Sequence, residues 1–154
     1  MRIRVRTGDS LWYFSQLFAL PLQLVLDSNR NINPSNVQVG QEINIPGFRK
    51  LTYTIKKGDT FWEIAANRNI ALDAIQLLNP GVNPNTLQIG QEIFVPSRVT
   101  EPLVDSKREY DSTLLTKDLR NLAEVYPFVR YQSIGKSVLG QDIKEIQIGN
   151  GPKR

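Results

Sequence analysis

The chain contains an internal repeat, and this repeat constrains its fold more than any other feature of the sequence. The segment Gly8–Trp12 (GDSLW) recurs as Gly58–Trp62 (GDTFW), and a constant offset of 50 residues aligns the two copies without a gap. The same offset aligns Asn29 with Asn79, Asn33-Pro34 with Asn83-Pro84, segment 37–43 with 87–93, and Pro46 with Pro96. Matches spread so evenly indicate two copies of one small supersecondary unit.

Each copy has the residue pattern of a strand, two short helices and a second strand. In the first copy these are a strand at Ile3 and Val5, a helix from Leu11, a helix from Leu22 to about Asn29, and a strand over 43–45. In the second copy they are a strand at Tyr53 and Ile55, a helix from Phe61, a helix from Leu72 to about Asn79, and a strand over 93–95. Antiparallel pairing of the outer strands then predicts an α+β fold made of two βααβ modules in tandem.

The start of the first helix differs between the copies. In the second copy Thr60 and Glu63 fit a capping box, in which each side chain binds a free backbone N–H of the other residue. In the first copy Tyr13 stands where the box needs Glu, so Asp9 or Ser10 must cap the helix alone. For the Asp of this turn in both copies, we favour capping over direct ligand contact.

Each copy resembles the LysM family, a module that binds glycans containing N-acetylglucosamine. The resemblance rests on Gly8–Trp12 with Asn29, on the segment from Val39 to Pro46, and on their counterparts in the second copy. It implies a ligand groove between the loop after the first strand and the loop after the second helix. By this resemblance the groove residues are Gly8, Asp9, Ser10, Leu11, Asn29, Arg30, Asn31 and Ile32 in the first copy, and Gly58, Asp59, Thr60, Phe61, Asn79, Pro80, Gly81 and Val82 in the second. The first copy departs from the family where Arg30 stands in the place of Pro80.

The predicted grooves suit an N-acetyl sugar, which offers an amide and a methyl group to backbone donors, acceptors and a small apolar surface. Glycine in such a loop lets the backbone come close, because it has no Cβ. Trp12 and Trp62 lie beside the apolar face of the first helix in each copy, and we expect them to be half exposed. Burial against a neighbouring element is favoured over sugar stacking. The short connection after Gly47 spans at most about 17 Å, so the two modules must lie close together. Two weak sites on one polymer would gain about 10²–10⁴ in avidity.

The composition excludes several catalytic and metal sites. The 154 residues include no His and no Cys, which removes the usual zinc ligands, disulfides, thiolate nucleophiles and Ser-His-Asp triads. An Asp–Glu pair recurs, as Asp9 with Glu42 and as Asp59 with Glu92. A unit of ~45 residues has little volume for the deep cleft that glycoside hydrolysis needs, so we expect no catalysis by these pairs.

Charge and hydropathy predict neither a nucleic-acid nor a membrane partner. The net charge is only +4, and Arg2, Arg4 and Arg6 are the basic residues that line up on one side of a predicted strand. No run approaches the ~20 apolar residues of a transmembrane helix, and no apolar stretch of a signal peptide follows the basic start. We expect synthesis in the cytoplasm, with spore or cell-wall association implied by the resemblance.

The last third predicts an incomplete α/β segment after a linker. Its elements are a helix with Leu115, Leu119, Leu122 and Tyr126 on one face before Pro127, a strand over 129–134, a turn over 135–140 and a strand over 143–148. One helix and a hairpin leave a sheet edge and an apolar face uncovered. The predicted boundaries are 1–47 for the first module, 48–51 for a linker, 52–97 for the second module, 98–109 for a linker, and 110–154 for this segment.

This last segment resembles the start of the zinc metallocarboxypeptidases. The resemblance rests on Tyr110-Asp111, Tyr126-Pro127, the run Ser133–Ile143 and the run Ile148–Gly151, with Gln141 where the family usually has Arg. Tandem LysM modules ahead of such a start are similar to the bacterial γ-D-glutamyl-diaminopimelate peptidases, which cut peptidoglycan stem peptides. The family's zinc ligands and catalytic Glu lie beyond Arg154, so the resemblance assigns no catalytic or metal residue here and implies zinc only in a complete peptidase domain.

The sequence therefore predicts non-catalytic binding of peptidoglycan or chitin-type polymers, which would target a cell-wall peptidase to its substrate. The alternative is the N-terminal part of an active zinc peptidase, whose catalytic part is missing from this chain. A third hypothesis is that the repeats mediate protein contacts only.

Overall fold

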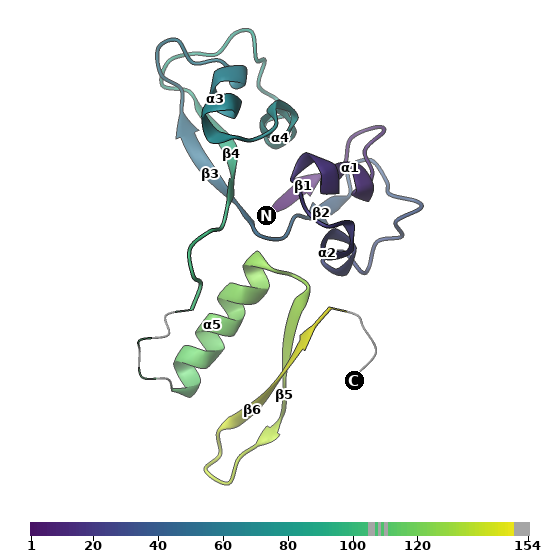
Figure 1. The fold of residues 1–154 in the computed structure, drawn as a ribbon, viewed down its shortest axis with the longest axis vertical. Helices are drawn as coiled ribbons and strands as arrows, with labels where there is room; N and C mark the ends of the chain where they lie inside the picture. The colour runs from purple at the N-terminus through teal and green to yellow at the C-terminus, as the bar shows by residue number, and fades with distance from the viewer. Residues whose placement is uncertain (105–106, 108, 110, 150–154) are drawn as a thin grey trace.

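The computed structural model describes residues 1–104, 107, 109 and 111–149, and it forms three small α+β units (Figure 1). Each unit contains one two-stranded antiparallel sheet, with the pairs β1–β2, β3–β4 and β5–β6. The elements are β1 (Arg2–Arg4), α1 (Leu11–Leu17), α2 (Leu22–Asp27), β2 (Glu42–Asn44), β3 (Phe48–Thr54), α3 (Phe61–Arg68), α4 (Leu72–Leu78), β4 (Glu92–Arg98), α5 (Ser112–Val125), β5 (Val129–Lys136) and β6 (Asp142–Ile148). The order strand-helix-helix-strand occurs twice, which confirms the tandem βααβ prediction.

In the first module, two short helices pack on a three-residue strand pair. The register places Ile3 opposite Ile43, as the alternating pattern requires. The largest fully buried side chains of its core are Phe14, Ile43, Ile45 and Val25. Since large apolar side chains contribute roughly 1.5–3 kcal/mol each when buried, these few residues supply most of the stability of so small a unit.

The second module is built on longer strands than the sequence predicted. β3 and β4 pair over seven residues each, from Phe48 opposite Arg98 to Thr54 opposite Glu92. Residues 48–51, which were predicted to be a linker, therefore form the first part of β3. Pairing with β4 satisfies the backbone N–H and C=O groups that a linker would leave to water. The modules consequently lack a free hinge at this point.

The two modules pack against each other, as the short connection predicted. Ala74 and Leu77 of α4 are buried in the same apolar cluster as the core of the first module. Phe48, at the start of β3, belongs to this cluster too, and the Arg98 guanidinium lies 4.8 Å from the centre of its ring. The second module thus supplies part of the first module's apolar contacts.

The last unit is a helix beside a hairpin, and the hairpin exposes several apolar side chains. Asp111 caps α5 by accepting a hydrogen bond from the Leu114 amide. A bulge between Ser133 and Gly135 lets β5 run to Lys136, so the turn is shorter than the predicted 135–140. Exposed apolar side chains on the hairpin are Ile134, Val138, Leu139, Ile143, Ile146 and Ile148.

Part of the motif behind the metallocarboxypeptidase resemblance lies outside the described residues. This part comprises Tyr110, Asn150 and Gly151. The C-terminal end of α5 contacts the first module, because the Gly47 amide donates to the Val125 carbonyl at 2.9 Å. In the part of the chain that the structure describes, no helix is both long and apolar enough to span a membrane.

Candidate functional site

The loop after the first strand of each module is a tight turn with the same geometry in both copies. Gly8 and Gly58 have φ angles of 86° and 88°, a left-handed conformation that favours glycine. The backbone N–H of Arg6 donates to Asp9 Oδ2 at 2.8 Å, and the N–H of Lys56 donates to Asp59 Oδ2 at the same distance. Each carboxylate therefore closes the turn.

The Asp residues do not cap the helices, which corrects the interpretation favoured from the sequence. Ser10 caps α1 by accepting from the Tyr13 amide, and Thr60 caps α3 within the predicted capping box with Glu63. The position of each Asp in the turn explains why it does not cap the helix. Each Asp lies one residue before the N-cap, and its carboxylate is already bound to the amide three residues upstream.

The two Asp carboxylates have different second partners. Asp59 accepts a hydrogen bond from the Tyr53 hydroxyl at 2.8 Å. The pKa of Asp59 lies below its ordinary value, mainly because of the Lys56 amide and then the Tyr53 hydroxyl. In the first module the Arg6 side chain takes this place, with its Nε 3.2 Å from Asp9 Oδ2. Both carboxylates are thus held within their own turns.

The loop after the second helix is fixed by a buried asparagine. Asn29 and Asn79 are only 5% and 6% exposed. Asn79 Nδ2 donates to the carbonyls of Ile75 and Phe94, both at 2.7 Å, and Oδ1 accepts from the Phe94 amide at 2.8 Å. Asn29 makes the equivalent three bonds in the first module. These side chains hold the loop on the closing strand and point away from solvent. The backbone N–H and C=O groups of both residues are also hydrogen-bonded within the chain, so Asn29 and Asn79 act as anchors of the loop.

Within each module, the two predicted groove loops share one apolar cluster. Leu11 is buried in the core of the first module, and Ile32 packs against that core. Phe61 and Val82 are related in the same way in the second module. The side chains of Leu11 and Phe61 are 2% exposed, so they belong to the cores on which the loops pack and not to the loop surface. The exposed predicted residues are Gly8, Asn31, Gly58, Thr60, Pro80 and Gly81, while Asp9, Ser10, Arg30, Ile32, Asp59 and Val82 are partly exposed.

Arg30, which replaces the family's Pro, is engaged inside the chain. Its guanidinium donates to the backbone carbonyl of Asp27 at 3.2 Å and to the carbonyl of Gly149. Gly149 follows β6, so this side chain joins the second loop of the first module to the last unit. The two predicted grooves therefore differ in their surroundings.

Trp12 and Trp62 are exposed, and the favoured prediction of burial against a neighbouring element is wrong. Their exposed fractions are 61% and 68%, and among the described residues neither indole has a ring contact or a hydrogen bond. Each follows a predicted groove residue directly in sequence. Val39 and Ile89, at equivalent positions of the repeat, are also exposed, at 67% and 71%. The exposure of Val39 and Ile89 was not predicted from the sequence, although an apolar residue recurs at this position in both copies.

In the first of the recurring Asp–Glu pairs, each carboxylate is paired with a different arginine. Glu42 is exposed and lies 3.7 Å from Arg2, while Asp9 is bound within its turn. Among the residues that the structure describes, no group of three or more His, Cys, Asp or Glu side chains could hold a metal ion.

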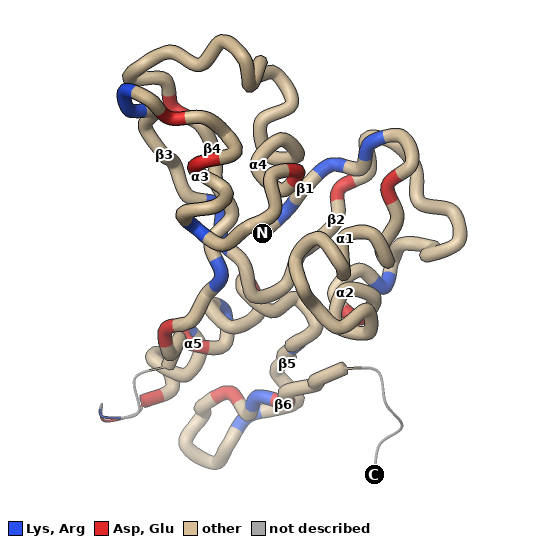
Figure 2. Tube along the Cα trace, turned by 45° about the horizontal axis from the view of Figure 1, so that its top comes forward, with Lys and Arg blue, Asp and Glu red and all other residues tan. Residues whose placement is uncertain are grey.

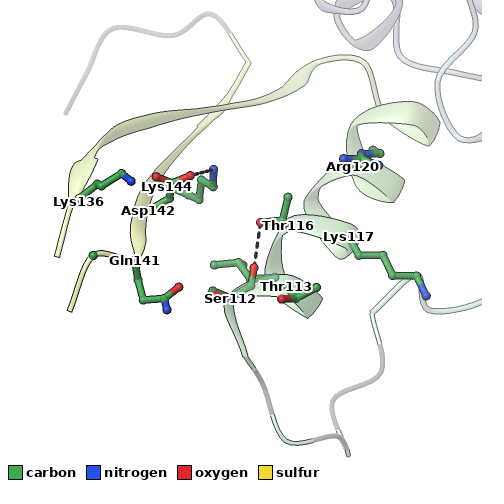
Figure 3. Close-up of a pocket in the computed structure, with 11 residues that line it drawn as sticks. Ser112, Thr113, Thr116, Lys117, Arg120, Lys136, Gln141, Asp142 and Lys144 are labelled. Carbon is green, nitrogen blue, oxygen red and sulfur yellow. Dashed lines mark hydrogen bonds and ion pairs between the residues drawn. The ribbon is translucent and has the colours of Figure 1, made fainter.

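A cavity of about 610 Å³ lies between α5 and the β5–β6 hairpin, in the last unit. Lys144 pairs with Asp142 at 3.1 Å, which lowers the pKa of that carboxyl, and Lys117 points away from the hairpin (Figure 3). Among the described residues that line this cavity, Asp142 is the one carboxylate. None of the predicted groove residues contributes to this cavity.

Comparison with known proteins matches both copies to one family. The model of the LysM domain matches residues 3–46 and 53–96. The chain is 66% identical over all 154 residues to the gamma-D-glutamyl-L-diamino acid endopeptidase 1 of Lysinibacillus sphaericus, and it spans 39% of that protein's length. It is 31% identical over 52 residues to the uncharacterized protein YqgT of Bacillus subtilis, which is 34% of this chain and 14% of that one.

A solved structure of similar sequence is the LysM domain of a Volvox carteri chitinase, at 59% identity. The match covers 32% of this chain and all of that domain, with a TM-score of 0.31. LysM domains bind polymers of N-acetylglucosamine such as peptidoglycan or chitin. With two matched copies that together cover more than half of its length, this chain belongs to the LysM domain family.

Proposed function

We propose that the two LysM modules bind the N-acetylglucosamine-containing glycan of peptidoglycan without cleaving it, and so hold a cell-wall peptidase on its polymer. The observation that carries this proposal is the recurrence, in both copies, of the same glycine-containing turn beside the same asparagine-anchored loop. Exposed backbone at Gly8, Gly58 and Gly81 offers N–H and C=O groups to the acetamido group of a sugar.

The exposed tryptophans extend this proposed site. An indole beside each first loop presents a flat apolar surface on which the less polar face of a sugar ring can stack, while its N–H stays free to donate. The large exposed fractions of Trp12 and Trp62 support stacking, because the described part of the chain leaves most of each side chain open to solvent.

Binding is tested by co-sedimentation with purified, protein-free peptidoglycan. We expect the chain to pellet with the polymer and to release no stem peptides. NMR titration with chitooligosaccharides or soluble muropeptides should shift the resonances of residues 8–11, 29–32, 58–61 and 79–82. Failure to pellet, together with unmoved resonances in all four segments, would favour the hypothesis that the repeats mediate protein contacts only.

Replacing Trp62 with alanine should weaken glycan binding while leaving the fold intact. An exposed side chain contributes little to stability, so the melting temperature should stay within about 2 °C of the wild type. Loss of a stacking surface should weaken affinity about tenfold, equivalent to ~1.4 kcal/mol, as measured by isothermal titration with chitooligosaccharide. Leu139→Ala is the matched control, because it removes an exposed apolar side chain far from the modules. Equal affinities of the two variants would refute stacking on Trp62.

The second candidate function is that of a peptidoglycan endopeptidase, of which this chain would form the N-terminal part. It is favoured by the 66% identity with an endopeptidase over the whole of this chain. A zinc site of the metallocarboxypeptidase kind would need His residues, which these 154 residues do not contain. Release of stem peptides by an extended protein, and not by this chain, would assign binding to these residues and cleavage to others. Cell fractionation would test the proposed wall or spore association.

A further inference from the structure

The interface between the two modules forms where the internal repeat breaks down. On α4, Ala74 and Leu77 are 1% and 5% exposed, and both lie in the first module's core cluster. The equivalent positions of α2 are Leu24 and Asp27, which are only partly buried. The equivalent of Leu77 in the first module is therefore a charged residue, and both α2 positions are less buried than their counterparts in α4.

A polar cluster beside this apolar contact joins the modules directly. Asp73 of α4 accepts two hydrogen bonds from the Arg6 guanidinium, from Nη1 to Oδ1 at 2.8 Å and from Nη2 to Oδ2 at 2.6 Å. The Tyr13 hydroxyl donates to the same Oδ2 at 2.5 Å. In Figure 2 the acidic position of α4 lies beside the basic positions around β1. A two-point Arg–carboxylate pair fixes orientation as well as distance.

All three residues of this cluster depart from the repeat. Arg6, Tyr13 and Asp73 align with Lys56, Glu63 and Gln23, none of which can reproduce the arrangement. Tyr13 replaces the Glu that completes the capping box in the other module. The first module thus lacks one capping interaction and has a contact to its neighbour at the same position.

The cluster is also connected to the proposed glycan-binding loops. Arg6 binds Asp9 through Nε at 3.2 Å and Nη2 at 3.3 Å, and Asp9 belongs to the first loop of the first module. On the other side, α4 leads directly into Asn79, which anchors the second loop of the second module. One loop of each proposed site is therefore tied to the same ion pair.

We propose that Arg6, Tyr13 and Asp73 form an inter-module lock that holds the two LysM modules in one fixed orientation, so that the tandem recognises a glycan chain as a single unit with set spacing. This inference rests on the proposed glycan binding. A fixed pair loses little inter-module freedom when the second site engages, so glycans long enough to reach both sites gain most. Arg6, Tyr13 and Asp73 are then specificity-determining residues for glycan length.

The charged groups at the interface make the stability of the Arg6–Asp73 contact depend on pH. The groups that face Asp73 are Arg6, the Tyr13 hydroxyl and, through Arg6, Asp9. The Arg6 hydrogen bonds hold the pKa of Asp73 below its ordinary value, and the Tyr13 hydroxyl adds to this. A lowered pKa in the folded state means that the stabilisation is complete above the unfolded pKa and is lost as the pH falls through the folded pKa. The ion pair of Arg6 with Asp73 is therefore formed at neutral pH and is weakened in acid, where Asp73 is protonated.

The lock is tested with the Asp73→Asn variant of the full chain, which keeps the shape of the side chain and removes its charge. Residual dipolar couplings are measured separately for each module. Wild-type couplings should fit one alignment tensor, whereas the variant should need two. Glu92→Gln, an exposed carboxylate in the same module, is the control and should behave as the wild type. Tyr13→Phe, which removes one hydrogen bond, should give a smaller effect in the same direction.

Glycan length provides the second measurement. We expect the ratio of affinities for long and short chitooligosaccharides to fall at least threefold in Asp73→Asn, with the affinity for the short oligomer unchanged. Modules that bind saccharide but align independently in the wild type would overturn the lock and leave glycan binding standing. Modules that align as one body but bind no saccharide would contradict the proposed function instead. An unchanged length ratio in Asp73→Asn would remove the role in specificity.

Discussion

Replacing Asn79 with alanine is expected to destabilise the second module by about 2–4 kcal/mol, although the side chain carries no charge. Its amide makes three hydrogen bonds, to Ile75, to the Phe94 carbonyl and from the Phe94 amide, at a site that is 6% exposed. Truncation leaves these buried backbone groups without a partner and without water to replace it. The substitution therefore removes the link between the end of α4 and the strand β4.

Thermal unfolding followed by circular dichroism measures this effect. We expect the melting temperature of the second module to fall by more than about 10 °C. Asn85→Ala is the matched control, since Asn85 is exposed on the loop that follows and its substitution should change stability by less than about 0.5 kcal/mol. Asn79→Asp should also destabilise the module, because a carboxylate keeps the acceptor but loses the two donors. Similar melting temperatures for Asn79→Ala and Asn85→Ala would show that these bonds are not needed.

The second large effect is expected for Phe14→Ala, which should cost about 3–5 kcal/mol. Phe14 is fully buried at the centre of the first module. A module of ~45 residues has a total stability of only roughly 2–7 kcal/mol, so a cavity of this size removes most or all of it. Because Ala74 and Leu77 pack in the same cluster, the second module should lose part of its stability as well.

Trp12→Ala is the natural comparison, because it removes an even larger aromatic side chain from the same helix at a site that is 61% exposed. Its free energy of unfolding should differ from that of the wild type by less than about 1 kcal/mol. Urea unfolding with separate NMR signals for each module distinguishes a local effect from a shared one. A second module that unfolds at an unchanged urea concentration in Phe14→Ala would contradict coupling through α4.

Several features of this protein are determined by the sequence because they depend on residues that are close together in the chain. The repeat predicted two βααβ modules, and the capping box of Thr60 and Glu63 formed as its spacing required. The apolar residues Leu11, Phe14 and Phe18 recur at the spacing of one helical turn, and all three are buried. Each of these signals reflects one helical turn or one alternation of a strand, which nearby residues fix on their own.

Other features were decided only by the tertiary structure. The extension of β3 over residues 48–51 depends on pairing with β4, more than forty residues later, and the local pattern there has no turn or strand signal strong enough to show it. The direction of the Asn29 and Asn79 side chains depends on the closing strand that they bind. The contact of Arg6 with Asp73 joins residues 67 positions apart, and the repeat does not predict it, because the aligned residues Lys56 and Gln23 form no equivalent pair. Such contacts depend on how segments that are distant in the chain come together, either within one module or between the two, and no local residue pattern records this.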